Sequence, residues 1–256
     1  MERERWRCHP RAVPTNHFDE PVAATYDVDS ASMFAPEVLD PTLDVLVDLA
    51  GPAGAALELA VGTGRVALPL AERGVRVHGI ELSPAMLRHL HTKPGAEMVA
   101  TTEGDMSSTR VEDRFDLVYL VFNTIGNVTS QDGQVAVFAN AAAHLEPGGH
   151  FVVEVGVPRL QWVPVGERFH VFARTENYLG VDEYDVVTQQ LWSHHYDFTG
   201  DEGHRSSIPF RYVWPSELDL MARLAGMTLV HRWAGWDRSP FTADSTSHVS
   251  VWRLAG

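Results

Sequence analysis

The stretch AALELAVGTGRVALPLAERGVRVHGIE, residues 55–81, sets the architecture of this chain. It reads as a short apolar strand over residues 56–60, a glycine-rich turn, a helix that closes at Gly74, and a second strand over residues 75–80 that ends on an acid. Strand, glycine turn, helix and strand in this order make the βαβ unit with which many α/β proteins bind a nucleotide cofactor. The stretch therefore predicts an α/β fold built on a mostly parallel sheet.

The glycine turn alone does not choose the cofactor. Gly62, Gly64 and Ala67 satisfy the G-x-G-x-x-G/A pattern of dinucleotide folds, and Glu81 follows Gly62 by 81 − 62 = 19 residues, near the ~20 expected for a ribose-binding acid. Glu58 favours another ligand, because a carboxylate buried at the end of a strand is costly unless it meets a cation or hydrogen-bond donors. S-adenosyl-L-methionine carries an ammonium group and a sulfonium, whereas a pyrophosphate would repel this acid. The alternative is that Glu58 is a solvated acid at the strand end.

Four motifs carry a resemblance to a known family. They are ELAVGTGR at residues 58–65, the acid Glu81, GDM at residues 104–106, and the strand FDLVYLVFN at residues 115–123. With these motifs the chain resembles the class I S-adenosylmethionine-dependent methyltransferases over roughly residues 20–155. Within that superfamily it is similar to actinobacterial small-molecule methyltransferases, such as the amino-sugar N-methyltransferases of antibiotic pathways.

The resemblance implies a fold and a set of cofactor contacts. The expected fold is a Rossmann-like, mostly parallel seven-stranded sheet with helices on both faces. In the family, the acid at Glu81 accepts from both ribose hydroxyls, the acid at Asp105 accepts from the adenine amino group, the backbone of Met106 donates to the ring, and a tyrosine at Tyr26 covers the cofactor. The first glycine of the family's loop is replaced here by Ala60. The expected cofactor-binding residues are Tyr26, Glu58, Ala60, Gly62, Gly64, Glu81, Leu82, Met86, Asp105, Met106 and Phe122.

Beyond Pro158 the sequence changes character. Residues 165–214 hold alternating, aromatic-rich runs punctuated by glycine, which predict antiparallel strands inserted after the fifth core strand. We expect an N-terminal arm and cofactor-covering segment over residues 1–36, a methyltransferase domain over residues 37–256, and within it an antiparallel insertion over residues 160–214 that roofs the acceptor pocket. The candidates to line this pocket are Trp192, His194, Tyr196, Phe210, Arg211 and Tyr212.

Methyl transfer from a sulfonium is an in-line displacement that depends mainly on alignment. A hydroxyl or protonated amine acceptor also needs a base near neutral pH, for which histidine is suited. His194 and His195 are neighbours on an expected strand, so they point to opposite faces and only one can enter the pocket. The expected catalytic residues are His194 or His195 as base, with Asn123 and Tyr26 as positioning groups.

The favoured function is methyl transfer from S-adenosyl-L-methionine to an oxygen or nitrogen of a natural product or sugar intermediate. An NAD-dependent oxidoreductase and a non-catalytic nucleotide-fold module are two further candidate functions. A metal-assisted mechanism needs clustered oxygen ligands, and the segment after the fourth strand offers only Asn123, Asn127 and Asp132. We therefore expect no metal.

Composition limits the partners and the compartment. The net charge of −14 argues against a nucleic-acid partner, because nucleic-acid binding depends on lysine and arginine. No apolar run is long enough to predict a membrane span, and the opening MERERWRCHPRAV reads as a flexible arm rather than a secretory signal. The single cysteine, Cys8, fits the cytoplasm. A homodimer is possible.

Three helix boundaries can also be predicted. Asp40 and Pro41 indicate a helix start, with its end at Gly51, and Ser83 and Pro84 indicate another start. Residues 17–33 are too polar and broken for a long helix.

Overall fold

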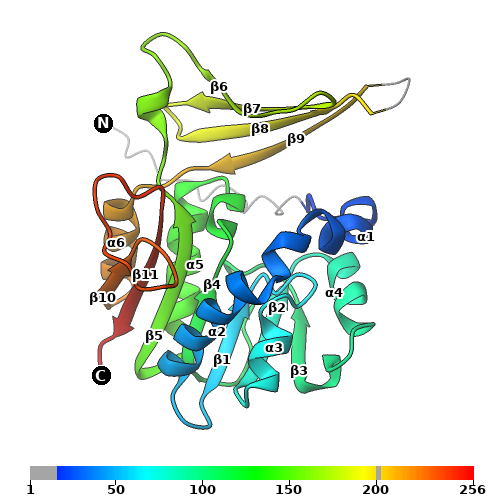
Figure 1. Ribbon diagram of the computed structural model, residues 1–256. Helices are drawn as coiled ribbons and strands as arrows, with labels where there is room; N and C mark the ends of the chain where they lie inside the picture. The colour runs from blue at the N-terminus through cyan, green and yellow to red at the C-terminus, as the bar shows by residue number, and fades with distance from the viewer. Residues whose placement is uncertain (1–15, 200–202) are drawn as a thin grey trace, which may run out of the picture.

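The computed structural model describes residues 16–199 and 203–256, so Cys8 and the basic opening of the chain lie outside the described residues. The described chain forms two sheets (Figure 1). The larger has the strand order β10-β11-β5-β4-β1-β2-β3, and the smaller has the order β6-β7-β8-β9. The strands of the larger sheet are β1 (Ala55–Leu59), β2 (Arg76–Glu81), β3 (Val99–Glu103), β4 (Phe115–Leu120), β5 (Leu145–Gly156), β10 (Met227–Trp233) and β11 (Ser247–Leu254).

Strands β1 to β5 pair in parallel, and β10 and β11 join them antiparallel beside β5. The chain reverses its strand order at β1, between β2 on one side and β4 on the other. In open α/β sheets, ligands bind beyond the carboxyl ends of the strands at such a point. The expected Rossmann-like, mostly parallel seven-stranded sheet is confirmed.

Helices cover both faces of this sheet. They are α2 (Pro36–Ala50), α3 (Ala67–Glu72) and α4 (Pro84–His91) on one face, and α5 (Gln131–His144) and α6 (Pro215–Leu224) on the other. Two apolar clusters result, because β1 and β4 contribute buried side chains to both faces. Within the described residues, none of the helices is both long and apolar enough to cross a lipid bilayer.

The start of α2 differs from expectation, whereas residues 17–33 hold no long helix, as predicted. Residues 17–33 contain a short helix, α1 (Glu20–Asp29), followed by a 3₁₀ turn, η1 (Ala31–Phe34). The predicted helix start at Asp40 is wrong, because α2 begins at Pro36 and Pro41 lies inside it. A proline at the first helical position has a suitable φ and needs no N–H partner, so the earlier proline starts the helix.

Serine side chains cap the two helices that follow β2 and β4. Ser83 Oγ accepts from the N–H of Met86 at 3.3 Å, which confirms the predicted cap of α4. Ser130 Oγ accepts from the N–H of Gly133 at 3.1 Å at the start of α5. Both helices therefore begin at the carboxyl edge of the sheet.

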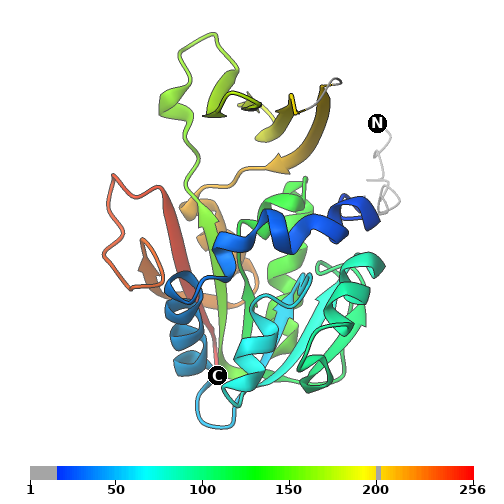
Figure 2. The ribbon, with the colours of Figure 1, turned by 45° about the vertical axis from the view of Figure 1, so that its right-hand side comes forward.

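The inserted sheet after β5 is also confirmed. Its antiparallel strands are β6 (Phe169–Arg174), β7 (Tyr178–Asp185), β8 (Gln190–Asp197) and β9 (His204–Arg211). Figures 1 and 2 show this sheet standing beyond the carboxyl ends of the parallel strands, with β9 nearest to them. We call these four strands the roof sheet.

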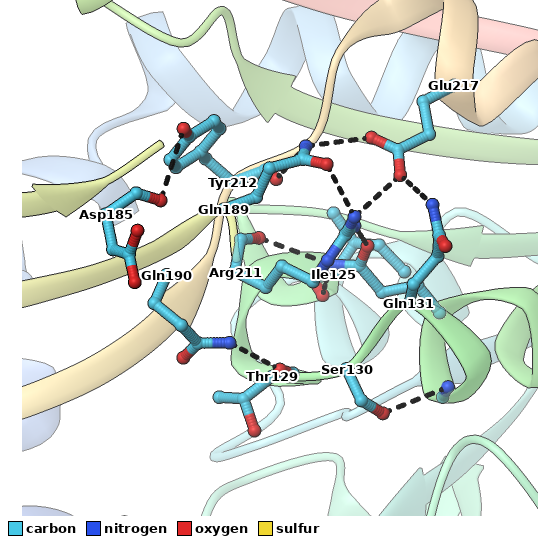
Figure 3. A network of polar contacts seen from close by, with 12 residues as sticks. Ile125, Thr129, Ser130, Gln131, Asp185, Gln189, Gln190, Arg211, Tyr212 and Glu217 are labelled. Carbon is cyan, nitrogen blue, oxygen red and sulfur yellow. Dashed lines mark hydrogen bonds and ion pairs between the residues drawn. The ribbon is translucent and has the colours of Figure 1, made fainter. Parts of the chain in front are cut away.

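A buried polar network joins the roof sheet to the core (Figure 3). The guanidinium of Arg211, at the end of β9, donates to Glu217 of α6 at 2.7 Å, to Gln134 of α5 at 2.5 Å and to Gln189 at 2.8 Å. Tyr212 is buried beside it. The expectation that Arg211 lines the acceptor pocket is therefore wrong, because its side chain is occupied in this joint, whereas a pocket role for Tyr212 stays a prediction.

The joint lies over the end of β4. A Cβ added at Gly126, in the 3₁₀ turn η3 (Thr124–Asn127), would lie 3.5 Å from Phe210 Cδ1 of β9. Gln190 of β8 also donates to the carbonyl of Thr129 at 2.7 Å (Figure 3). The roof sheet is thus fixed over the segment that carries the predicted catalytic asparagine.

Candidate active site

The glycine turn after β1 bends sharply and is open on one side. Ala60, Gly62 and Gly64 all have positive φ, at 59°, 57° and 83°. A Cβ at Gly64 would come within 3.0 Å of the Leu68 side chain, whereas at Gly62 it would meet nothing closer than Met86 Cε at 4.0 Å. Close packing against Leu68 therefore explains the glycine at position 64. The open space beside Gly62 fits the approach of a ligand.

The Glu81 carboxylate, at the end of β2, holds this turn in place. Oε2 accepts from the N–H of Gly62 at 2.9 Å, and Oε1 accepts from the N–H of Ser83 at 2.8 Å. Burial raises the pKa of Glu81, and these backbone hydrogen bonds oppose that rise. Each carboxylate oxygen keeps a second lone pair, so the expected bonds to two ribose hydroxyls are compatible with this geometry. Leu82, the next residue, is half-buried at the same edge.

Glu58 lies on β1 and is 3% exposed. Its Oε2 accepts from the hydroxyl of Tyr119 on the neighbouring strand β4 at 2.9 Å. Burial raises the pKa of Glu58 to about 8, while the bond from Tyr119 and the positive charge of Arg65 act in the opposite direction. The alternative of a solvated strand-end acid is wrong for this residue.

Asp105 and Met106 follow β3 at the same edge. The carboxylate of Asp105 accepts from the N–H of Ser107 at 2.8 Å and from its hydroxyl at 2.7 Å, so it closes a local turn. The Met106 carbonyl accepts from the side-chain amide of Asn140 at 2.7 Å. The turn fixes both residues of the GDM motif, and their contacts to adenine stay predictions.

Phe122 and Asn123, directly after β4, both have a φ of 60°. The N–H of Phe122 donates to the Glu154 carboxylate at 2.9 Å, and Asn123 Oδ1 accepts from the N–H of Gly156 at 2.5 Å. The guanidinium of Arg65 lies 5.1 Å from the centre of the Phe122 ring. Two consecutive left-handed residues that the neighbouring strand β5 holds in place are typical of a functional site.

Tyr26 lies on α1, packed against Met86 of α4. Its pKa is raised, mainly by burial and also by the carboxylates of Glu81 and Glu58, against the opposing charge of Arg65. The structure therefore brings Tyr26 into the electrostatic neighbourhood of both acids that flank the glycine turn.

The two histidines point to opposite faces of β8, as expected. His195 Nδ1 lies 2.5 Å from the Tyr178 hydroxyl, and its Nε2 lies 3.3 Å from Ser193 Oγ. Burial lowers the pKa of His195, although the Asp182 carboxylate acts to raise it. At pH 7 the ring is therefore neutral and able to accept a proton.

His194 has a different set of partners on the other face. Its Nδ1 lies 2.8 Å from Ser207 Oγ, and its Nε2 lies 3.3 Å from the Glu183 carboxylate. Trp192, two residues earlier on the same face, is exposed. Arg205 also lies 3.3 Å from Nδ1 of His194, so the partners of His194, like those of His195, all belong to the roof sheet.

Both faces of β8 are connected to the segment that follows β4. Leu191 and His195 alternate by two along β8 and therefore share a face. Leu191 pairs with Phe210 of β9, which reaches Gly126. Gln190, on the face of His194, donates to the carbonyl of Thr129 at 2.7 Å, so this contact does not separate the two histidines.

Two residues of the site were not predicted. Tyr119, the partner of Glu58, is the one hydroxyl in the apolar run over residues 117–122, and it pairs with Glu58 in the sheet register. Glu154, near the end of β5, holds the backbone of Phe122. The hydroxyl is visible in the sequence, but the strand order that places it beside Glu58 is not.

Metal ligands are not clustered in the described ranges. Across residues 16–199 and 203–256, no three or more His, Cys, Asp or Glu side chains are grouped so that they could hold a metal ion.

Comparisons with known proteins agree with this geometry. A family model described as a methyltransferase domain matches residues 56–149. A cypemycin N-terminal methyltransferase from a Streptomyces species is 29% identical over 208 residues, which are 76% of this chain and 81% of that protein. A dTDP-3-amino-3,4,6-trideoxy-alpha-D-glucopyranose N,N-dimethyltransferase from Streptomyces venezuelae is 34% identical over 103 residues, 40% of this chain and 42% of that protein.

Several solved structures match along nearly the whole chain. The CcbJ methyltransferase from Streptomyces caelestis is 34% identical, with a TM-score of 0.76, over 90% of this chain and 96% of that one. A match of this extent reaches beyond the parallel sheet into the region of the roof sheet. On this similarity and on the geometry of the glycine turn and its two acids, the chain belongs to the class I S-adenosyl-L-methionine-dependent methyltransferases.

Proposed function

We propose that this enzyme transfers a methyl group from S-adenosyl-L-methionine to an amine nitrogen, or alternatively a hydroxyl oxygen, of a small natural product or sugar intermediate. The observation that carries the proposal is the pair of buried acids, Glu58 and Glu81, on either side of an open glycine turn. Relatives named for an N-terminal amine and for an amino sugar favour nitrogen as the methylated atom.

Each chemical group of the methyl donor has a suitable partner among the residues around the glycine turn. Glu81 keeps lone pairs for the ribose hydroxyls while its backbone bonds hold Gly62 in place. Glu58, with its pKa near 8, gains a stabilising partner when an ammonium group lies close to it. Tyr26 and Met86 provide apolar surface above the turn. When bound, S-adenosyl-L-methionine supplies an electrophilic methyl group on a sulfonium.

Acceptor activation is assigned to the roof sheet. His195 accepts the proton of the acceptor, since its ring is neutral at pH 7. His194, which contacts Ser207 and the Glu183 carboxylate on the other face of β8, is the alternative base. Asn123 and Tyr26 remain positioning residues, at the ends of β4 and α1. A small-molecule acceptor, rather than nucleic acid, is supported by the net charge of −14.

The test has a binding step and a turnover step. Isothermal titration of the full chain with S-adenosylhomocysteine and with NAD should give heat only with the former. Labelled S-adenosyl-L-methionine is then incubated with a panel containing an amino-sugar nucleotide, a peptide with a free amino terminus and a hydroxylated aromatic, followed by mass analysis. Glu81→Ala serves as the control for background methylation. Binding of NAD but not of S-adenosylhomocysteine would overturn the proposal.

A further inference from the structure

Helix α1 is tied to the glycine turn by a single side chain, Asp27. Its Oδ1 accepts from the hydroxyl of Thr63 at 2.6 Å, and its Oδ2 pairs with the ammonium group of Lys93 at 2.5 Å. Thr63 is the middle residue of the glycine turn between Gly62 and Gly64, and it is 1% exposed. The helix is thus bonded directly to the loop that the ligand must approach.

Lys93 closes this set of bonds into a ring. Besides pairing with Asp27, its ammonium group donates to the carbonyl of Thr63 at 2.8 Å and lies 5.4 Å from the centre of the Phe34 ring. Lys93 stands just past the end of α4, so the ring connects α1, η1, α4 and the glycine turn. We call the contacts among Asp27, Thr63 and Lys93 the α1 latch.

Among the residues that the structure describes, apolar packing of α1 is confined to one small cluster, in which Ala23 and Tyr26 meet Ala85 and Met86 of α4. Ala23 is the one buried residue within this helix, and Tyr26 is only partly covered. A helix of ten residues is marginal by itself in water, so it depends on its contacts with the rest of the molecule. The latch is therefore the main polar attachment on the side of α1 that faces the turn.

A second attachment lies at the other end of the helix and serves as a comparison. Glu20 pairs with Arg88 of α4 at 2.5 Å, and both side chains are more than half exposed. Solvent-exposed ion pairs of this kind contribute little, because water and salt screen them. The two attachments thus differ in what they touch: the Glu20 pair holds one helix to another, and the latch holds the helix to the turn.

We propose that Asp27 is a positioning residue whose carboxylate fastens α1 over the glycine turn, so that α1 retains bound cofactor and must release the latch at every cofactor exchange. The proposal rests on the proposed placement of the cofactor at this turn. Because Tyr26 precedes Asp27 on the helix, the latch also sets where Tyr26 stands above the site. Release of the latch frees the helix, the tyrosine and the hydroxyl of Thr63 together.

The experiment measures exchange rates rather than affinity alone. Full-length protein is immobilised, and association and dissociation of S-adenosylhomocysteine are followed by surface plasmon resonance. Asp27→Asn loses the charge that pairs with Lys93, and Lys93→Met loses that pair and the hydrogen bond to the Thr63 carbonyl, so each should raise both rate constants by roughly three- to tenfold. Lys93→Arg, which keeps the charge, should restore rates close to those of the original chain. Glu20→Gln, the matched control on the same helix, should leave both rate constants unchanged.

Each outcome has a clear meaning. Unchanged rates in Asp27→Asn and Lys93→Met overturn the latch. A faster dissociation with a slower or unchanged association also overturns it, because a merely loosened site does not admit ligand faster. Lys93 is partly exposed, so Lys93→Met tests the same contact if Asp27→Asn fails to fold. If the original chain itself does not bind S-adenosylhomocysteine, the proposed function fails instead.

Discussion

Glu58 and Tyr119 face each other across the parallel pair β1 and β4, and the tyrosine hydroxyl donates to the carboxylate at 2.9 Å. One hydrogen bond does not compensate for burying a carboxylate. The pKa of Glu58 consequently rises to about 8, and the acid is mostly protonated at pH 7. The cofactor site therefore contains a protonated carboxyl group, Glu58, that would lose its proton when a cation binds beside it.

The first prediction concerns stability against pH. The folded-state pKa of Glu58 is about 8, above its ordinary value of 4.5, so the protonated acid stabilises the fold at low pH and this stabilisation is lost as pH rises through about 8. The free energy of unfolding should fall by about 2–4 kcal/mol between pH 5 and pH 9. In Glu58→Gln most of this fall should disappear, as measured by urea unfolding at several pH values. The exposed Glu37→Gln is the control, and an equally flat profile in that variant would contradict the assignment to Glu58.

The second prediction concerns protons released by ligand binding. An ammonium group close to Glu58 lowers the pKa of that carboxyl, so S-adenosylhomocysteine should displace up to about one proton at pH 7. Calorimetry in buffers of different ionisation enthalpy measures this number directly. Glu58→Gln should bind without proton release. Equal proton release in both proteins would mean that another group titrates.

A third prediction separates the two histidines. Once an acceptor is identified, His195→Gln should lower kcat by about 10²-fold, the usual effect of losing a general base, whereas His194→Gln should stay within a few-fold of the original chain. Because burial holds the pKa of His195 below its ordinary value, the rate should fall on the acidic side of about pH 6.5. That acidic limb should vanish in His195→Gln alone. A larger loss in His194→Gln would reverse the assignment.

A fourth prediction concerns the joint between the roof sheet and α6. Arg211 is 4% exposed and Glu217 is 15% exposed by side chain, so Arg211→Met leaves a largely buried carboxylate without its cation and should cost about 3 kcal/mol in chemical unfolding. Arg211→Met with Glu217→Leu should recover part of that loss. Arg76→Met, which removes an exposed pair with Asp113, is the control and should cost less than about 1 kcal/mol. Additive effects of Arg211→Met and Glu217→Leu would show that the two side chains do not stabilise each other.

The cofactor edge of the fold could be predicted because its signals are local. A strand, two glycines and an acid lie within residues 55–81. The two glycines, Gly62 and Gly64, have the positive φ that favours glycine. The alternation that put His194 and His195 on opposite faces is likewise a property of neighbouring residues. Local pattern was misleading at Asp40, because the earlier proline, Pro36, begins the helix.

Contacts between distant segments could not be predicted in the same way. In the sequence Arg211 stands between two aromatic residues, a pattern that favours the lining of a pocket. No neighbouring residue indicates that Glu217 and Gln134 accept hydrogen bonds from its guanidinium. Asp27 is likewise one of many acids in a chain with 34 Asp and Glu residues. Its bonds to Thr63 and Lys93 span 36 and 66 positions, as 63 − 27 and 93 − 27, and exist only once α1 has docked on α4.

The chain leaves the core after Gly156 and returns to it at Trp214, and both crossings lie at one corner of the molecule (Figure 1). The roof sheet is therefore an insertion whose two ends lie close together. A relative's sheet joined at these two points would also have to supply the contacts that Arg211 makes with Gln134 of α5 and Glu217 of α6. On the proposed assignment of acceptor activation to the roof sheet, exchanging this sheet between relatives would change the range of acceptors while the methyl-donor site stays constant.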